Sequence, residues 1–284
     1  MRYITLPSVL LIGLAALALL APWISVQNPL DPREIDLANA FLPPIWTDGS
    51  KAPFWMGSDD QGRDVLSATL YGLRESMVIA AAAVALGALL GMSAGIAAGV
   101  RGGFLDSLLM RIADIQLAFP AILIALLIDG LLRTVLPRAM APQAATPVLI
   151  VSIALATWVP FARSIRAAVQ RERAKDYITA ARVTGCSWSR IAWRHLLPNI
   201  APAIGVVATA SFAVAILTEA TLSFLGLGVP LTRPSLGGLL NTGQHYLLSG
   251  EWWIAAFAAV VLVALIASAN AVADRLASNT ERRH

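Results

Sequence analysis

The stretch Asp176-Tyr-Ile-Thr-Ala-Ala-Arg-Val-Thr-Gly185, continued to Leu197-Pro198-Asn199, decides the fold of this chain. It lies in a polar, basic segment between long apolar runs, and eight of the 21 Lys and Arg residues fall between positions 163 and 199. A segment of this kind between apolar helices faces the cytoplasm. We therefore expect it to contact a soluble partner there.

Two short helices joined by a glycine turn are predicted within this loop. Residues 166–184 are compatible with a helix and include no proline. Gly185 can take the positive φ that ends a helix and turns the chain. A second helix is predicted over Ser187–Leu196, ending before Pro198 because proline cannot continue a helix without losing a hydrogen bond.

The predicted loop offers both small and basic side chains to a partner. Ala180 and Ala181 lie among few bulky groups, which lets another surface approach closely. Arg182, Arg190 and Arg194 are placed to meet acidic groups on that surface. Charge alone favours a simpler interpretation, a basic loop touching anionic lipid. The combined spacing of Ala-Ala, Gly and Leu-Pro favours protein docking.

Composition places the chain in a membrane. Of 284 residues, 57% are hydrophobic and 13% charged, whereas about 25% charge is usual in soluble domains. Mean hydropathy is +0.70. The lone Cys186 excludes an internal disulfide and a multi-cysteine metal site. The net charge of +4 follows membrane topology, so we do not interpret it as nucleic-acid binding.

Six apolar runs near the length that crosses a bilayer predict an all-α integral membrane protein with six transmembrane helices. The predicted spans are Leu6–Ile24, Met77–Val100, Ser107–Leu132, Pro147–Ala162, Ile200–Phe224 and Trp252–Ala273. Two overlapping GxxxG patterns, Gly87–Gly91 and Gly91–Gly95, predict close packing of the second span, within this subunit or against a partner.

Positive charge fixes the predicted orientation. With both termini inside, the cytoplasmic segments hold 14 of the 21 Lys and Arg residues and the external segments hold seven. The opposite orientation would place the eight charges of 163–199 outside, against the rule. Trp252 and Trp253 then fall at the outer interface, where aromatic belts occur.

The chain divides into an N-terminal transmembrane helix (1–26), an external loop with an interfacial helix (27–76) and a core of five transmembrane helices (77–284) that carries the loop 163–199. The first helix has the basic start and apolar middle of a signal peptide. It lacks a clear small-x-small cleavage site before Trp23, so we expect it to stay attached.

An acidic cluster, Asp59–Asp64, precedes the second span. Gly57 and Gly62 within or beside it could suggest a calcium loop, but the regular oxygen ligands and distal Glu of an EF-hand are missing. No metal site is predicted. The glycines are expected to form turns, and Asp64 to cap an amphipathic helix, Val65–Leu73, at the outer interface.

Ionisable residues inside spans are functional candidates. Asp114 follows Arg111 by three residues, so a structural ion pair on one helix face is predicted. Glu219 lies toward the outer end of the fifth span. It is the candidate for the translocation pathway, with a packing contact between helices as the alternative.

Catalytic activity is not expected from this chain. It has no Gly-x-x-x-x-Gly-Lys-Ser/Thr phosphate loop, so it is not predicted to bind ATP. The three histidines, His195, His245 and His284, fall in loops or at the terminus and complete no nucleophile–His–Asp set. No catalytic residue and no cofactor are assigned.

Several motifs resemble the permeases of ABC importers. The spacing of Ala180-Ala181, Gly185 and Leu197-Pro198 resembles their EAA loop, although Thr179 stands where the family has its leading Glu and His195 where an aliphatic residue is frequent. Other stretches resemble the C-type subunit of the dipeptide/oligopeptide/nickel group: Trp55-Met-Gly-Ser-Asp59 through Ser67, Arg111-Ile-Ala-Asp114 with Phe119-Pro120, Ser223-Phe-Leu-Gly226-Leu-Gly228, and Pro234-Ser-Leu-Gly237 with Trp252-Trp253.

The resemblance implies a type I ABC-importer permease fold in a bacterial cytoplasmic membrane. Its implied partners are a homologous B-type permease, two ATPase subunits that hold ATP and Mg, and an external solute-binding protein. The loop would be the coupling helix that docks on an ATPase and drives alternating access. The residues carried over to that role are Asp176, Thr179, Ala180, Ala181, Arg182, Gly185, Leu197 and Pro198.

The implied substrates are short peptides, and nickel or a metal chelate is the alternative within the same family. The spans hold no His, Cys or Met cluster suited to a bare metal ion, which says nothing about chelates. A stand-alone secondary transporter would need coupling-ion sites and internal repeats, and neither is visible in the sequence. A membrane scaffold that does not transport is the third alternative.

Overall fold

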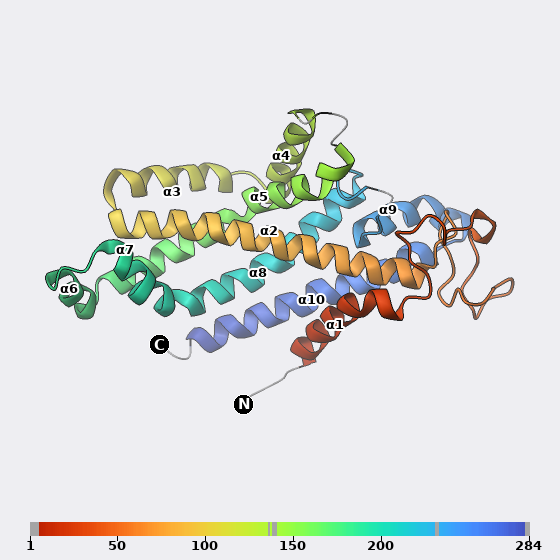
Figure 1. Ribbon diagram of the computed structural model, residues 1–284, viewed down its shortest axis with the longest axis horizontal. Coiled ribbons are helices and arrows are strands. Elements are labelled where there is room, and N and C mark those ends of the chain that lie inside the picture. Colours follow the sequence, from red (N-terminus) through yellow and green to blue (C-terminus); the bar gives the residue numbers. More distant parts are fainter. Residues whose placement is uncertain (1–5, 136, 138–140, 231–232, 282–284) are drawn as a thin grey trace.

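The computed structural model describes residues 6–135, 137, 141–230 and 233–281. Long helices run side by side along the molecule, with short helices at both ends (Figure 1). The helices are α1 (Leu6–Ile24), α2 (Val65–Arg101), α3 (Gly103–Leu117), α4 (Ala121–Val135), α5 (Ala141–Arg173), α6 (Asp176–Val183), α7 (Trp188–Ile191), the π-helical η3 (Ala192–Leu196), α8 (Leu197–Phe224), α9 (Leu236–Tyr246) and α10 (Trp253–Glu281), with short 3-10 turns η1 (Leu37–Asn39) and η4 (Leu247–Ser249).

Among the described residues, five helices are long and apolar enough to cross a membrane, and they account for five of the six predicted spans, except that Trp252 precedes α10. The third predicted span, Ser107–Leu132, is not one straight helix. It is broken into α3 and α4, which meet at 97°. Pro120 has no backbone N–H, and α3 ends in tight bonds from Ala118 and Phe119 to carbonyls three residues back. The side chain of Gln116 holds this corner to α5 by donating to Leu155 O at 2.9 Å.

The second span begins earlier than predicted. Asp64 caps it, and its carboxylate accepts from Ser67 N at 2.7 Å. The segment Val65–Leu73 is not a separate interfacial helix as predicted, because it continues without a break into the membrane helix. Val65 and Leu73 are buried, so tertiary packing rather than a membrane surface holds this segment.

Four glycines of α2 pack against α5 within this subunit. A Cβ on Gly95 would lie 2.6 Å from Ala162 O, and one on Gly91 would lie 2.5 Å from the Cβ of Phe161. Gly87 and Gly99 meet α5 in the same way. Because only a residue without a side chain permits this approach, the GxxxG patterns serve the pairing of α2 with α5.

The long loop before α2 is anchored to the last helix. Trp253 is buried and donates its Nε1 hydrogen to Ser58 O at 3.0 Å, so it is a structural anchor rather than part of an aromatic belt. In the acidic cluster, Asp59 pairs with Arg63 at 2.6 Å. Among the described residues, no group of three metal-ligating side chains comes together here or elsewhere.

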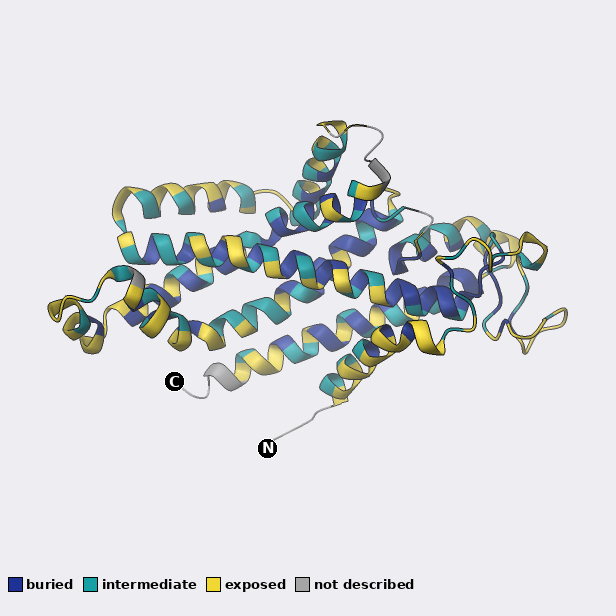
Figure 2. Cartoon of the chain, viewed as in Figure 1, coloured by how far each residue is buried: buried dark blue, intermediate teal, exposed yellow. Residues whose placement is uncertain are grey.

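The core lies where α2, α5, α8 and α10 meet, with α9 closing one end, while α1, α3 and α6 expose much of their surface (Figure 2). A second apolar cluster, containing Ile165, Val169, Ile178 and Ile191, lies near α6 and α7 at the opposite end from α9. The loop 163–199 therefore has its own small core.

Candidate coupling loop and outer cavity

The loop 163–199 folds back on α5 to form a compact cap. The predicted helix over 166–184 is interrupted after Arg173, and α6 starts at Asp176. Burial of Ile178 against the cluster of Ile165 and Val169 explains the break, because one continuous helix would carry this side chain away from α5. Tertiary packing here overrides local helix propensity.

The end of α6 confirms the predicted glycine turn. Gly185 has a φ of +85°. Cys186 N donates to Ala181 O, and Gly185 N donates to Arg182 O, both at 3.0 Å, which together make a Schellman motif. A Cβ on Gly185 would meet no atom within 4 Å, so the requirement for glycine comes from the backbone alone.

One face of α6 points away from the molecule. Asp176, Thr179, Ala180 and Val183 are all exposed, and their i, i+3, i+4, i+7 spacing puts them on a single stripe. We call these four residues the α6 face. Ala181 does not belong to it, because it packs against the second cluster. Val183, which our sequence prediction missed, is 83% exposed, and the spacing counted from Asp176 would have found it.

A polar network ties α6 to its neighbours. Buried Glu172 at the end of α5 pairs with Lys175 at 2.8 Å and accepts a hydrogen bond from the hydroxyl of Tyr177. Asn199 of α8 donates to the same hydroxyl at 2.9 Å. Partial burial, together with the contact to Glu172, raises the pKa of Tyr177, which keeps its donating proton in place. The network joins α5, α6 and α8 at one point.

The second half of the loop differs from prediction around Pro198. The predicted helix Ser187–Leu196 does not end there, because α7 passes through the π-helical turn η3 directly into α8. Leu197 N reaches back five residues to Ala192 O. This wider turn accommodates Pro198, which has no N–H to donate, in the first turn of α8. Leu197 packs against the second cluster, whereas Pro198 is exposed.

The arginines of the loop have different surroundings. Arg182 lies over the ring of Trp188 at 4.6 Å, and Arg173 lies over the same ring at 5.0 Å. Both distances fall in the range of cation–π contacts. Arg190 and Arg194 are exposed, as docking to an acidic partner requires.

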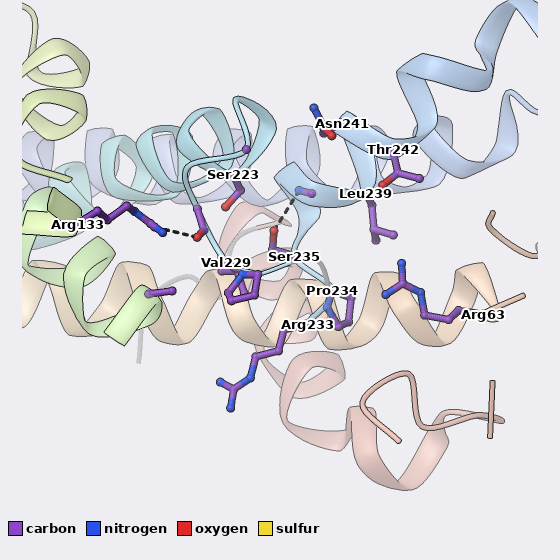
Figure 3. A pocket seen from close by; sticks show the side chains of 15 residues that line it. Arg63, Arg133, Ser223, Val229, Arg233, Pro234, Ser235, Leu239, Asn241 and Thr242 are labelled. Carbon is purple, nitrogen blue, oxygen red and sulfur yellow. Dashed lines mark hydrogen bonds between the residues drawn. The ribbon is translucent and has the colours of Figure 1, made fainter. Parts of the chain in front are cut away.

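A cavity of about 390 Å³ opens at the opposite end of the molecule, beside α9 (Figure 3). Three arginines line it, and each has a carboxylate partner: Arg63 with Asp59, Arg133 with Asp129 at 2.6 Å, and Arg233 with Glu75 at 3.6 Å. Arg133 also donates to the carbonyls of Leu227 and Gly228, so it ties α4 to the turn after α8. The cavity is of a size that holds small solutes.

The remaining predicted site residues lie apart from these two regions. Glu219 is fully buried and accepts from Ser223 Oγ at 2.7 Å. Ser223 lines the cavity beside α9, which places Glu219 one helical turn behind its wall. The predicted pair of Arg111 with Asp114 is wrong. Asp114 instead meets Arg163 of α5 at 3.6 Å, because the broken third span lays α3 along α5.

Comparison with known proteins identifies relatives over most of the chain. A sequence model of a family described as "Binding-protein-dependent transport system inner membrane component" matches residues 87–283. The dipeptide transport system permease protein of Haemophilus influenzae is 31% identical over 92% of this chain and 84% of that protein. The di/tripeptide transport system permease protein of Pseudomonas aeruginosa is 34% identical over 91% of this chain and 81% of its own length.

A further relative and a solved structure are similar to this chain. A putative peptide transport system permease protein of Brucella suis is 37% identical over 94% of this chain and 83% of that protein. The inward-facing structure of the MetNI methionine ABC transporter aligns with a TM-score of 0.59 at 22% identity. It covers 74% of this chain and 95% of its own, and the likeness is one of fold.

Proposed function

The chain belongs to the family of binding-protein-dependent transport system inner membrane components and is an ABC-transporter permease with the type I fold; from that premise we propose that it carries short peptides into the cytoplasm. Its relatives named as dipeptide, di/tripeptide and oligopeptide permeases support this choice of substrate. A metal chelate is the alternative substrate, and an uptake measurement with each class of solute distinguishes the two.

The α6 face carries the proposed coupling to an ATPase. It presents small side chains and one exposed valine on a helix held by the Schellman motif and by the buried Ile178. A flat stripe of this kind suits docking into a cleft on a partner. Arg190 and Arg194 of the same loop are also exposed. In this scheme ATP and Mg bind to two partner ATPase subunits, and this chain performs no covalent chemistry.

Movement of α6 would reach the membrane helices along two routes. The contacts of Glu172 and Tyr177 join α6 to α5 and α8. The turn η3 joins α7 to α8 without a flexible linker. Closure of the ATPase subunits would then rock α5 and α8 together, which exposes a pathway alternately to each side. A second permease would complete that pathway, and an external binding protein would deliver the peptide.

The test is uptake by the complete transporter in proteoliposomes, with labelled dipeptide outside and ATP inside. Ala180→Trp places a bulky group on the α6 face, and we expect at least a tenfold loss of uptake with weaker retention of the ATPase subunits. Ser187→Asp is the matched control, because it changes an exposed loop residue off this face and keeps a side chain able to cap α7.

Two outcomes contradict the proposal. Wild-type uptake by Ala180→Trp would remove the coupling role from the α6 face. If the transporter took up a nickel chelate and none of the tested peptides, the proposed substrate class would be wrong, while the coupling role would stand.

A further inference from the structure

An apolar groove runs along the outside of α2 in the half nearest the loop 163–199. Its volume is about 490 Å³, and its other wall is formed by α7, η3 and the start of α8. We propose that this groove binds one anionic phospholipid from the leaflet on that side, with an acyl chain along α2 and the phosphate at Arg101 and Arg173. The proposal does not depend on which solute is transported.

The length of the groove matches one leaflet. Along α2 it extends from Leu89 through Met92 and Ile96 to Val100. These twelve residues of α-helix, with eleven steps of about 1.5 Å between them, rise about 17 Å. This is close to half of the roughly 30 Å hydrocarbon core. An acyl chain that enters from the polar end therefore has apolar contacts over its length.

The polar end of the groove carries positive charge that the protein does not neutralise. Arg101 ends α2 and lines the groove. Arg173 donates to Gly99 O at 3.4 Å and lies over Trp188, which places it at the same level of α2. Neither arginine forms an ion pair with a carboxylate in the described parts of the chain. A phosphodiester is the complementary group.

Two tryptophans mark this end as a membrane interface. Trp188 forms part of the wall, and Trp193 is 73% exposed beside it. Tryptophan prefers the headgroup level of a bilayer, where its ring lies partly in the apolar layer. The groove thus has apolar contacts along α2 and, at one end, indole rings together with arginines. This combination suits a phospholipid, whose phosphate supplies the counter-charge that the two arginines lack.

The test uses the transporter purified with its partner subunits, stripped of lipid and titrated with dioleoyl phosphatidylglycerol or dioleoyl phosphatidylcholine during native mass spectrometry. We expect tighter retention of phosphatidylglycerol. Arg101→Gln should weaken that retention about fivefold and leave phosphatidylcholine unaffected. Ala97→Trp, which fills the groove, should weaken both. Arg74→Gln and Ala85→Trp are the matched controls, because they change exposed residues elsewhere on α2.

Four results would overturn the proposal. The first is equal retention of the two lipids by the unmodified transporter. The second is binding of phosphatidylglycerol that Arg101→Gln does not alter. The third is loss of the second permease from Ala97→Trp with lipid retention unchanged, which would make the groove an interface between subunits. Displacement of phosphatidylglycerol by equimolar inorganic phosphate would identify a phosphate site without a role for the acyl chain, and would also refute it.

Discussion

At the scale of single residues, Gly185 and Asp64 each fix the end of a helix by a different physical device. Gly185 supplies a left-handed backbone that closes α6, with open space where a side chain would be. Asp64 supplies a carboxylate that caps the N-terminus of α2. The first device concerns backbone sterics and the second hydrogen bonding, so they respond to different substitutions.

Gly185→Val should impair coupling. A β-branched residue in the left-handed region costs about 1–2 kcal/mol, which is enough to displace Cys186 and the start of α7. We expect ATP hydrolysis by the transporter to persist while peptide uptake falls. Gly185→Asn is the control, because asparagine tolerates positive φ and should retain most uptake. Normal uptake by the valine variant would show that the turn does not transmit movement.

Asp64 should make stability depend on pH in a defined direction. Burial raises the pKa of this carboxyl above its ordinary value, against the opposing hydrogen bonds from Ser67. The folded protein then binds the proton more tightly than the unfolded chain, so stability falls as pH rises from the ordinary carboxyl range through the raised pKa. Asp64→Asn, which still caps the helix, should remove this part of the dependence.

The measurement is the midpoint of thermal unfolding in detergent at a series of pH values, taken as the difference between the natural protein and Asp64→Asn. Asp64→Ala should in addition lower the midpoint at every pH, because a lost cap costs about 1 kcal/mol. Asp48→Asn, in an exposed part of the same loop, is the control. If the difference in unfolding midpoint between the natural protein and Asp64→Asn did not change with pH, burial would not raise the pKa of Asp64 as expected.

At the scale of helices, the close packing of α2 against α5 is the contact that the sequence predicted most directly. The GxxxG spacing predicted close packing and left the partner open, and the structure places that partner within the same subunit. Spacing alone could not decide this, because it fixes which face is flat and not what approaches it.

Gly91→Ala should test that contact. Its new Cβ would lie 2.5 Å from the Cβ of Phe161, which forces the helices apart and costs about 1–3 kcal/mol. We expect a lower unfolding midpoint in detergent. Gly13→Ala in α1 is the control, because nothing lies within 4 Å of the added methyl group and alanine favours a helix by about 1 kcal/mol. Equal midpoints for both variants would refute close packing at Gly91.

The helix boundaries that the sequence misjudged share one cause. The predictions treated Pro198 as a stop, Ser107–Leu132 as one span and Val65–Leu73 as a separate helix. In each case a contact between residues distant in sequence changed the outcome. The second apolar cluster packs beneath α7, which continues into α8; Gln116 holds the break between α3 and α4 to α5; and Val65 is buried against Trp253 at the start of α2. Local pattern carries no information about such contacts.

At the scale of the whole molecule, α6 and α7 of the loop 163–199 lie at the opposite end from α9 (Figure 1), and residues of α9 line the cavity. The concentration of basic residues in the loop 163–199 predicted only which side of the membrane that loop faces. The cavity itself was not predicted, because Arg63, Arg133 and Arg233 come together only through folding. The α6 face was predicted in part, through Asp176, Thr179 and Ala180.

Labelling of single cysteines should establish the orientation. In a Cys186→Ala background, Ser187→Cys places a thiol in the loop 163–199 and Asp48→Cys places one in the long loop before α2; both positions are exposed. A membrane-impermeant maleimide should label Asp48→Cys in right-side-out vesicles and Ser187→Cys only in inverted ones. The reverse pattern would place the basic loop outside and remove the proposed contact with the ATPases.

The length of α2 has a mechanical consequence. It has 37 residues and no internal proline, so it extends about 55 Å, well beyond the hydrocarbon core. Its N-terminal end is capped by Asp64, and near its C-terminal end Arg173 donates to Gly99 O. Such a rod works as a lever: a tilt of about 10° around its middle would carry each end about 5 Å in opposite directions. A contact that displaces one end of α2 would therefore displace its other end, on the opposite side of the membrane, without any bend in the helix.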